Sequence, residues 1–163
     1  MTLDELNRLD DAAFIAALGG IYEHSPWVPA GVLAGRPHAD TAALHGAMAA
    51  VVARAGPDAQ LALIRAHPDL GEKVGVLTEH SKSEQAGLGL DRLDPAEFER
   101  FMATNAAYRE KFGIPFVVCV REHTKDSILA NADARLGNSV DQEVETALGE
   151  IAKIARLRLE DAL

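Results

Sequence analysis

Helix-start signals recur along this chain, whereas signals for β-strands hardly occur. Several segments place a capping side chain three residues before a Glu or Gln, the pattern of a capping box. They include Thr2-Leu3-Asp4-Glu5, Asp94-Pro95-Ala96-Glu97 and Ser139-Val140-Asp141-Gln142. Runs of alternating apolar and polar residues, which indicate half-buried strands, are nearly absent. The sequence therefore predicts an all-α fold, a single compact helical domain of about seven or eight helices.

Caps, apolar spacing and stop signals predict where the helices lie. The first is expected over residues 2–18, ended by Gly19-Gly20. Residues 25–37 contain three prolines and are expected to form an ordered loop anchored by Trp27 rather than a helix. Phe116 to Val120 is apolar without alternation and is expected to be helical or extended core. The other expected helices run from Asp40 or Thr41 to Gly56, from Asp58 to His67, near 70–80, from Ser81 to Gly87, from Asp94 to Gly113, from Thr124 to Leu136 and from Ser139 to about Leu159.

Length and charge narrow the class of function. A chain of 163 residues is expected to form one domain, residues 1–163, that buries most of its unfolded surface. Its formal net charge of −9 disfavours nucleic acid, which needs clustered Lys and Arg, and also disfavours anionic membranes. The longest apolar run, Ile114 to Val120, is far too short to cross a bilayer. We therefore expect a soluble protein with neither kind of partner.

The N-terminus and the cysteine content indicate a cytoplasmic location. Met1 to Glu5 lacks the basic and apolar regions of a signal peptide, so export is not expected. The single cysteine, Cys119, has no internal partner for a disulfide, which fits a reducing compartment.

His67 is the first candidate for chemistry. Because a proline follows it, His67 is expected at or just past the end of a helix. A helix C-terminus favours the imidazolium by ~0.3–1 kcal/mol, so this histidine could give or take a proton near neutral pH. The alternative is a capping histidine bonded to a backbone carbonyl.

Glu84 also has two interpretations. Ser81 and Glu84 match the S-x-x-E capping box, in which Glu84 would only bond the backbone N–H of Ser81. In the other interpretation, its segment binds a ligand, because backbone donors at a helix N-terminus suit an anionic or polar ring substrate. The two roles are compatible.

Metal and nucleotide chemistry are not indicated. The six histidines form no H-E-x-x-H pattern, and one cysteine excludes Cys-based zinc spacing. The chain also lacks G-x-S-x-G, a P-loop and G-x-G-x-x-G. We expect neither a metal nor a cofactor. The histidines are His24, His38, His45, His67, His80 and His123.

Four motifs follow one another along nearly the whole chain: Glu23-His24-Ser25-Pro26-Trp27, His67-Pro68-Asp69-Leu70-Gly71, Ser81-Lys82-Ser83-Glu84-Gln85 and Phe112-Gly113-Ile114-Pro115-Phe116. In this order they resemble the OHCU decarboxylases of purine breakdown, which convert 2-oxo-4-hydroxy-4-carboxy-5-ureidoimidazoline to (S)-allantoin. The resemblance implies a cofactor-independent carboxy-lyase that acts on a small ureidoimidazoline acid and forms a symmetric homodimer.

The resemblance also implies roles for single residues. His67 would donate a proton, and Glu84 would hold the substrate hydroxyl and shape the charge of the site. Arg121 would pair with the substrate carboxylate, or else form a surface ion pair with Glu122 or Glu72. The other implied substrate-binding residues are Pro68, Ser81, Lys82, Ser83, Gln85, Ile114, Phe116, Val117, Val118, Cys119 and Val120.

The sequence departs from the pattern of the resembled family at two positions. His38 stands where an aromatic residue is usual and is expected to affect packing. Leu88 fills a position near Gln85 that is often small and could tighten the pocket. Two rival functions remain open at this point: a non-catalytic helical interaction module in which His67 and Glu84 are caps, and a decarboxylase acting on another imidazoline or ureido acid.

Overall fold

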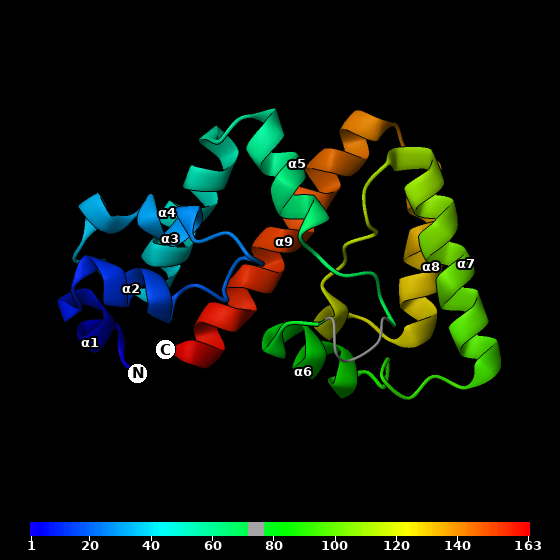
Figure 1. Ribbon diagram of the computed structural model, residues 1–163, viewed down its shortest axis with the longest axis horizontal. Helices are drawn as coiled ribbons and strands as arrows, with labels where there is room; N and C mark the ends of the chain where they lie inside the picture. The colour runs from blue at the N-terminus through cyan, green and yellow to red at the C-terminus, as the bar shows by residue number, and fades with distance from the viewer. Residues whose placement is uncertain (72–76) are drawn as a thin grey trace. The chain divides into compact units, whose positions relative to one another are not determined.

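The structure is a computed structural model that describes residues 1–71 and 77–163 (Figure 1). These residues are largely helical and contain no β-strand, which confirms the predicted all-α class. They include nine α-helices, close to the number expected, and none of these is long and apolar enough to span a membrane. The helices are α1 (Leu3–Arg8), α2 (Asp11–Ala17), α3 (Trp27–Ala30), α4 (Thr41–Arg54), α5 (Pro57–Arg65), α6 (Glu79–Gly87), α7 (Pro95–Phe112), α8 (Lys125–Arg135) and α9 (Val140–Ala162).

The chain divides into two compact units. The first contains residues 1–63 and 152–163, and the second contains residues 64–151. Helices α5 and α9 each contribute residues to both units. That residues 1–163 form one domain stays a prediction.

The N-terminal segment forms two helices instead of the single helix expected over residues 2–18. The Thr2 capping box is present at the start of α1. Leu9 is extended, with φ −64° and ψ 150°, and the Asp10 side chain accepts a hydrogen bond at 2.8 Å from a backbone N–H three residues later. Asp10 therefore starts a second helix, because its side chain satisfies a donor that has no partner inside the helix. The single-helix prediction was wrong at Leu9 and Asp10.

The proline-rich stretch is more helical than expected. An ordered loop was expected over residues 25–37, but α3 begins at Trp27, and the 3-10 helix η1 follows at Leu33–Gly35. Pro29 is compatible with α3 because it lies in the first turn, where backbone N–H groups have no partner inside the helix. The loop prediction was wrong for these short helices, since it treated every proline as a breaker.

The first unit has a continuous apolar core. In it α2 packs on α3, and α3 packs on α4. His38, expected to affect packing, is buried and stacks on Phe14 with ring centroids 6.3 Å apart. Its Nε2 lies 3.2 Å from the carbonyl oxygen of Val32. The most deeply buried core side chains include Leu6, Phe14, Leu18, Leu44, Met48, Ala155 and Leu159.

The second unit is built on α7, α8 and the first part of α9. Helices α7 and α8 lie side by side (Figure 1). Asp94 starts α7 with the predicted capping box, and Gly113 ends it at φ 69°, a left-handed conformation that glycine adopts without strain. After α7 the chain is extended and buried up to the 3-10 helix η3 (Val120–Glu122). This agrees with the expectation of extended core for these residues.

Candidate active site

All residues predicted to be catalytic or substrate-binding lie in the second unit, residues 64–151. They come from the loop after α5, from α6, and from the extended segment that leads into η3. The loop and α6 are joined by a hydrogen bond, and α6 packs against η3. The fold therefore brings three separate sequence motifs together.

His67 lies two residues beyond Arg65, the last residue of α5, as expected from the proline that follows it. Its backbone N–H donates to the carbonyl oxygen of Ile64 at 3.1 Å, which forms a turn at the helix end. The residue is buried, with 6% of its surface exposed. The position is the one expected for this histidine, and its role as a proton donor stays a prediction.

The loop after His67 is anchored on α7. Arg109 donates from Nε and Nη2 to the two carboxylate oxygens of Asp69, at 3.3 Å and 3.1 Å. One turn earlier on the same helix, Nδ2 of Asn105 donates to the carbonyl oxygen of Leu70 at 2.9 Å. Two successive loop residues are thus held by one face of α7.

The same loop is anchored on α6. The backbone N–H of Gly71 donates to Oε1 of Gln85 at 3.0 Å. Gly71 has φ 78°, and a Cβ there would lie 3.1 Å from Cδ1 of Leu93, so conformation and space both favour glycine. The Gln85 side chain therefore connects the histidine loop to α6.

Helix α6 begins at Glu79 and not at Ser81. Thr78 is its N-cap, and the Thr78 hydroxyl accepts a hydrogen bond from the backbone N–H of Ser81 at 3.2 Å. Glu84 consequently lies in the middle of the helix. The predicted Ser81–Glu84 capping box was wrong, and helix capping no longer explains Glu84. The helix expected near 70–80 falls largely on residues 72–76, outside the described part of the chain.

The predicted residues of α6 divide between two faces. Ser81 and Gln85 are buried, and Glu84 is half-buried. Because residues three and four apart share a helix face, these three side chains lie on the face that packs into the unit. Lys82 and Ser83 are exposed on the other side.

The extended segment is fully buried and partly bonded within the protein. The carbonyl oxygen of Val117 accepts a hydrogen bond from Nη1 of Arg135 at 2.7 Å, and the N–H of Cys119 donates to Oε1 of Glu150 at 3.3 Å. Within the described residues, the backbone N–H and C=O of Val118 make no hydrogen bond. Since buried backbone groups are nearly always paired, those of Val118, like those of Phe116, are candidates for contact with a bound molecule. The buried side chains are those of Ile114, Phe116, Val117, Val118, Cys119 and Val120.

Negative charge surrounds the cysteine of this segment. Burial above all, and then the carboxylates of Glu122 and Glu150, raise the pKa of the Cys119 thiol from 9.0 to about 11. Glu84 acts in the same direction, so its carboxylate lies within electrostatic range of the extended segment. The raised pKa disfavours the thiolate form of Cys119 near neutral pH.

Arg121 lies on η3 and is exposed. Since η3 contacts α6, Arg121 lies on an element that packs against the helix of Glu84. Of the two ion-pair partners considered for it, Glu72 lies outside the described residues. Its pairing with a substrate carboxylate stays a prediction.

Other histidines have structural partners. Nε2 of His45 lies 2.9 Å from the carbonyl oxygen of Ala152, and Nδ1 of His123 lies 2.9 Å from the Ser127 hydroxyl. Among residues 1–71 and 77–163, no group of three or more His, Cys, Asp or Glu side chains is arranged to hold a metal ion.

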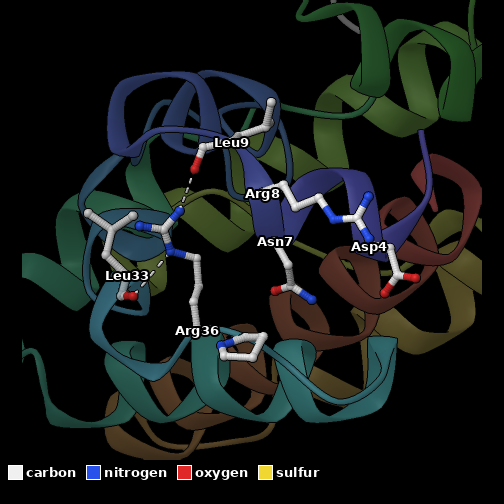
Figure 2. Close-up of a pocket in the computed structure, with 7 residues that line it drawn as sticks. Asp4, Asn7, Arg8, Leu9, Leu33 and Arg36 are labelled. Carbon is white, nitrogen blue, oxygen red and sulfur yellow. Dashed lines mark hydrogen bonds between the residues drawn. The ribbon is translucent and has the colours of Figure 1, made fainter.

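A pocket of about 610 Å³ lies in the first unit and contains none of the predicted site residues (Figure 2). The Arg36 guanidinium at this pocket donates to the carbonyl oxygens of Leu9, at 2.7 Å, and Leu33, at 3.2 Å. It also pairs with Asp11. Arg36 thus ties its own segment to the α1–α2 connection, and these bonds account for it without a ligand.

Sequence reasoning missed the residues that hold the site in place. Asn105 is a polar residue within the apolar stripe of α7, and Arg109 follows four residues later on the same face, so their spacing was a usable signal. Arg135 and Glu150 lie in regular helices, and no local pattern distinguishes them from solvent-exposed charges.

A buried histidine just past the end of α5 and a half-buried carboxylate on α6 are side chains of the types that enzymes use to move protons. The family model described as OHCU decarboxylase matches residues 7–160. The chain belongs to the OHCU decarboxylase family.

Individual relatives agree with this assignment. The 2-oxo-4-hydroxy-4-carboxy-5-ureidoimidazoline decarboxylase of Haloferax volcanii is 45% identical over 159 residues, which cover 98% of this chain and 94% of the relative. The Mus musculus protein of the same name is 34% identical over 166 residues, covering 100% and 93%. Relatives over nearly the full length are therefore carboxy-lyases, and this chain is an enzyme of that class.

Two crystal structures share the fold. That of (S)-allantoin synthase has a TM-score of 0.81 at 33% identity and covers 100% of this chain and 54% of the other. That of OHCU decarboxylase in the presence of (S)-allantoin has a TM-score of 0.68 at 18% identity, covering 94% and 97%, and supports the fold alone.

Proposed function

We propose that this protein decarboxylates 2-oxo-4-hydroxy-4-carboxy-5-ureidoimidazoline to (S)-allantoin and CO2 without a cofactor, with His67 as the proton donor. Family membership supports the reaction. The main structural support for this site is the hydrogen bond between Gly71 and Gln85. It connects the loop that contains His67 to α6, the helix that contains Glu84.

The substrate can serve as its own electron sink. The carbon that loses CO2 is bonded to an imine carbon, so the electron pair of the broken C–C bond forms a new C=C bond while the C=N pair moves to nitrogen, which takes up a proton. Proton addition to the former imine carbon, with loss of the hydroxyl proton, then gives allantoin. The protein has to orient the substrate, deliver a proton to one face and reduce the hydration of the carboxylate.

His67 and Glu84 share this work in the proposal. The dipole of α5 favours the imidazolium of His67, which delivers the proton to one face and so sets the S configuration. Glu84 accepts a hydrogen bond from the substrate hydroxyl. The place of Glu84 inside α6, on the face that packs into the unit, is compatible with this role.

Gln85 and Val118 supply the best-supported binding groups. Oε1 of Gln85 is bonded to Gly71, while its Nε2 makes no hydrogen bond within the described residues and can donate to the substrate. Val118 offers one backbone donor and one acceptor in a buried setting. In the proposal the remaining contacts come from Pro68, Ser81, Lys82, Ser83, Ile114, Phe116, Val117, Cys119, Val120 and Arg121, with Arg121 pairing the carboxylate.

A coupled assay tests the reaction. Urate is converted enzymatically to the unstable substrate, this protein is added, and optical activity is followed. We expect (S)-allantoin to form faster than the spontaneous racemic product, with turnover unchanged after exhaustive chelation. Racemic allantoin at the spontaneous rate would overturn the proposed function, and metal-dependent recovery after chelation would overturn the cofactor-free mechanism.

His67→Asn tests the proton donor in the same assay. We expect kcat to fall by ~10²–10⁴-fold with little change in Tm, because asparagine is tolerated at helix ends. His45→Asn is the control, since His45 bonds a backbone carbonyl in the first unit and should lose stability but not kcat. The reverse pattern would make His67 a structural histidine.

The proposal also includes a symmetric homodimer in the cytoplasm. Light scattering during size-exclusion chromatography measures the oligomeric state. A monomer at micromolar concentration would remove the dimer from the proposal.

A further inference from the structure

We propose that Arg109 is a positioning residue for His67 and acts through its ion pair with Asp69. The inference rests on the proposed function, in which His67 delivers the proton. Arg109 holds both oxygens of the Asp69 carboxylate, at 3.3 Å and 3.1 Å, from α7, an element that contains none of the predicted site residues.

The backbone between His67 and Asp69 is unusually restricted. Pro68 fixes its own φ near −65°, and the bulk of its ring limits the backbone of His67 as well. Few dihedral angles therefore separate the Asp69 carboxylate from the imidazole. A shift of Asp69 would be passed on to His67 instead of being absorbed by the chain.

The loop is held on both sides of its turn. Asn105, four residues before Arg109, holds the carbonyl oxygen of Leu70 at 2.9 Å, and Gln85 holds the N–H of Gly71 at 3.0 Å. Of these three side-chain anchors, Arg109 holds the loop residue closest to His67 in the sequence. Loss of this anchor would free the proline end of the loop while its glycine end stays fixed.

The solvent exposure of the Arg109–Asp69 pair allows an effect on turnover to be separated from an effect on stability. The Arg109 side chain is 46% exposed and that of Asp69 is 20% exposed. Ion pairs at such positions contribute little to folding because solvent screens them. The bidentate geometry nevertheless fixes direction as well as distance, which a proton donor requires. We therefore expect a large effect on turnover and a small effect on unfolding.

The test compares Arg109→Met with Arg100→Met in the allantoin assay. Arg100 lies on the same helix, is exposed and makes no interaction within the described residues. We expect Arg109→Met to lower kcat by roughly 10-fold or more, with KM within about 2-fold and Tm nearly unchanged, since small misplacements of catalytic groups are costly. Arg100→Met should match the wild type. Arg109→Lys should recover part of kcat, because lysine keeps the charge but not the two-point geometry.

A double-mutant cycle tests whether Arg109 acts on His67 through Asp69. Asp69→Asn should lower kcat as Arg109→Met does, and the double variant should be no worse than either single one. Additive losses would overturn the proposal, as would wild-type kcat in Arg109→Met or an equal loss in Arg100→Met. If Arg109→Met fails to fold, Arg109→Lys and Asp69→Asn decide by the same criteria. An inactive wild type would instead refute the proposed function, so the two failures are distinguishable.

Discussion

Glu84 does not take part in capping α6. Thr78 caps α6, and Glu84 lies well inside the helix. If its charge holds the substrate hydroxyl, Glu84→Gln should lower kcat by about 10-fold or more at nearly constant Tm, because glutamine keeps the shape but not the charge. Turnover and thermal unfolding are measured on the same preparation.

Thr78→Ala is the control for Glu84→Gln. Loss of the cap should cost ~0.5–2 kcal/mol of unfolding free energy, whereas Glu84→Gln should cost far less. Wild-type turnover in Glu84→Gln would leave His67 as the only catalytic residue of the proposed mechanism.

The start of α6 also shows a limit of local sequence patterns. Thr78 and Ser81 are both good caps, and only Ser81 is followed at the right distance by a Glu. In the structure Thr78 is the N-cap of α6. With this start, Ser81 and Gln85 lie on the buried face, and Gln85 forms its hydrogen bond with Gly71. Packing outside the helix therefore selects between two starts whose local energies are similar.

Tyr22 gives a test that is independent of function. It is 2% exposed, its hydroxyl finds no hydrogen-bond partner within the described residues, and burial raises its pKa to about 12. Tyr22→Phe should leave stability unchanged or raise it by about 1 kcal/mol, because it removes an unsatisfied polar atom. Urea unfolding measures the difference.

Tyr108→Phe is the matched comparison for Tyr22→Phe. The Tyr108 hydroxyl donates to Oε1 of Glu143 at 2.5 Å and accepts from Nη2 of Arg135 at 3.3 Å. Its removal should destabilise the protein by ~1–3 kcal/mol. A Tyr22→Phe variant that loses as much as Tyr108→Phe would contradict the reading of its hydroxyl as unsatisfied.

At the scale of elements, local chemistry predicted most helix starts. The caps at Thr2, Asp40, Asp94, Thr124 and Ser139 all hold in the structure. Each works through a side chain and a backbone N–H a few residues away, so the sequence alone contains both partners. Contacts between residues far apart in the sequence, such as that of Arg109 with Asp69, cannot be predicted from such local patterns, because only packing brings the two partners together.

A buried arginine holds part of the extended segment before η3. Arg135 donates to the carbonyl oxygen of Val117 at 2.7 Å and to Oε1 of Glu143 at 2.7 Å, and its guanidinium carbon lies 4.6 Å from the centre of the Phe116 ring. Arg135→Met should cost about 3–5 kcal/mol, because the buried Glu143 carboxylate loses its charge partner. Urea unfolding measures the loss.

A second variant separates charge from packing in this network. Arg135→Met combined with Glu143→Met should recover part of the loss, since it removes the unpaired buried charge. A double variant less stable than Arg135→Met alone would mean that packing and hydrogen bonding outweigh the charge term.

At the scale of the whole molecule, both compact units contain buried acidic groups that resist ionisation. Burial raises the pKa of Tyr22 in the first unit to about 12 and that of Cys119 in the second unit to about 11. Burial, with the hydrogen bond to Glu143, also raises the pKa of Tyr108. The folded protein therefore keeps protons that the unfolded chain releases at high pH.

The direction of the resulting pH dependence follows from proton linkage. In the unfolded chain the thiol and phenols ionise near their ordinary pKa values of 9.0 and 10.0. Their contribution to stability is complete below about pH 9 and is lost as the pH rises through the folded values, by about 1.4 kcal/mol per pH unit for each group. Urea unfolding from about pH 8 to about pH 11 should show this decline, and Tyr22→Phe should decline less steeply above about pH 10 because one such group is gone. A wild-type unfolding free energy that stays constant over this range would mean that these groups ionise alike in the folded and unfolded states, and that their burial does not control their protons.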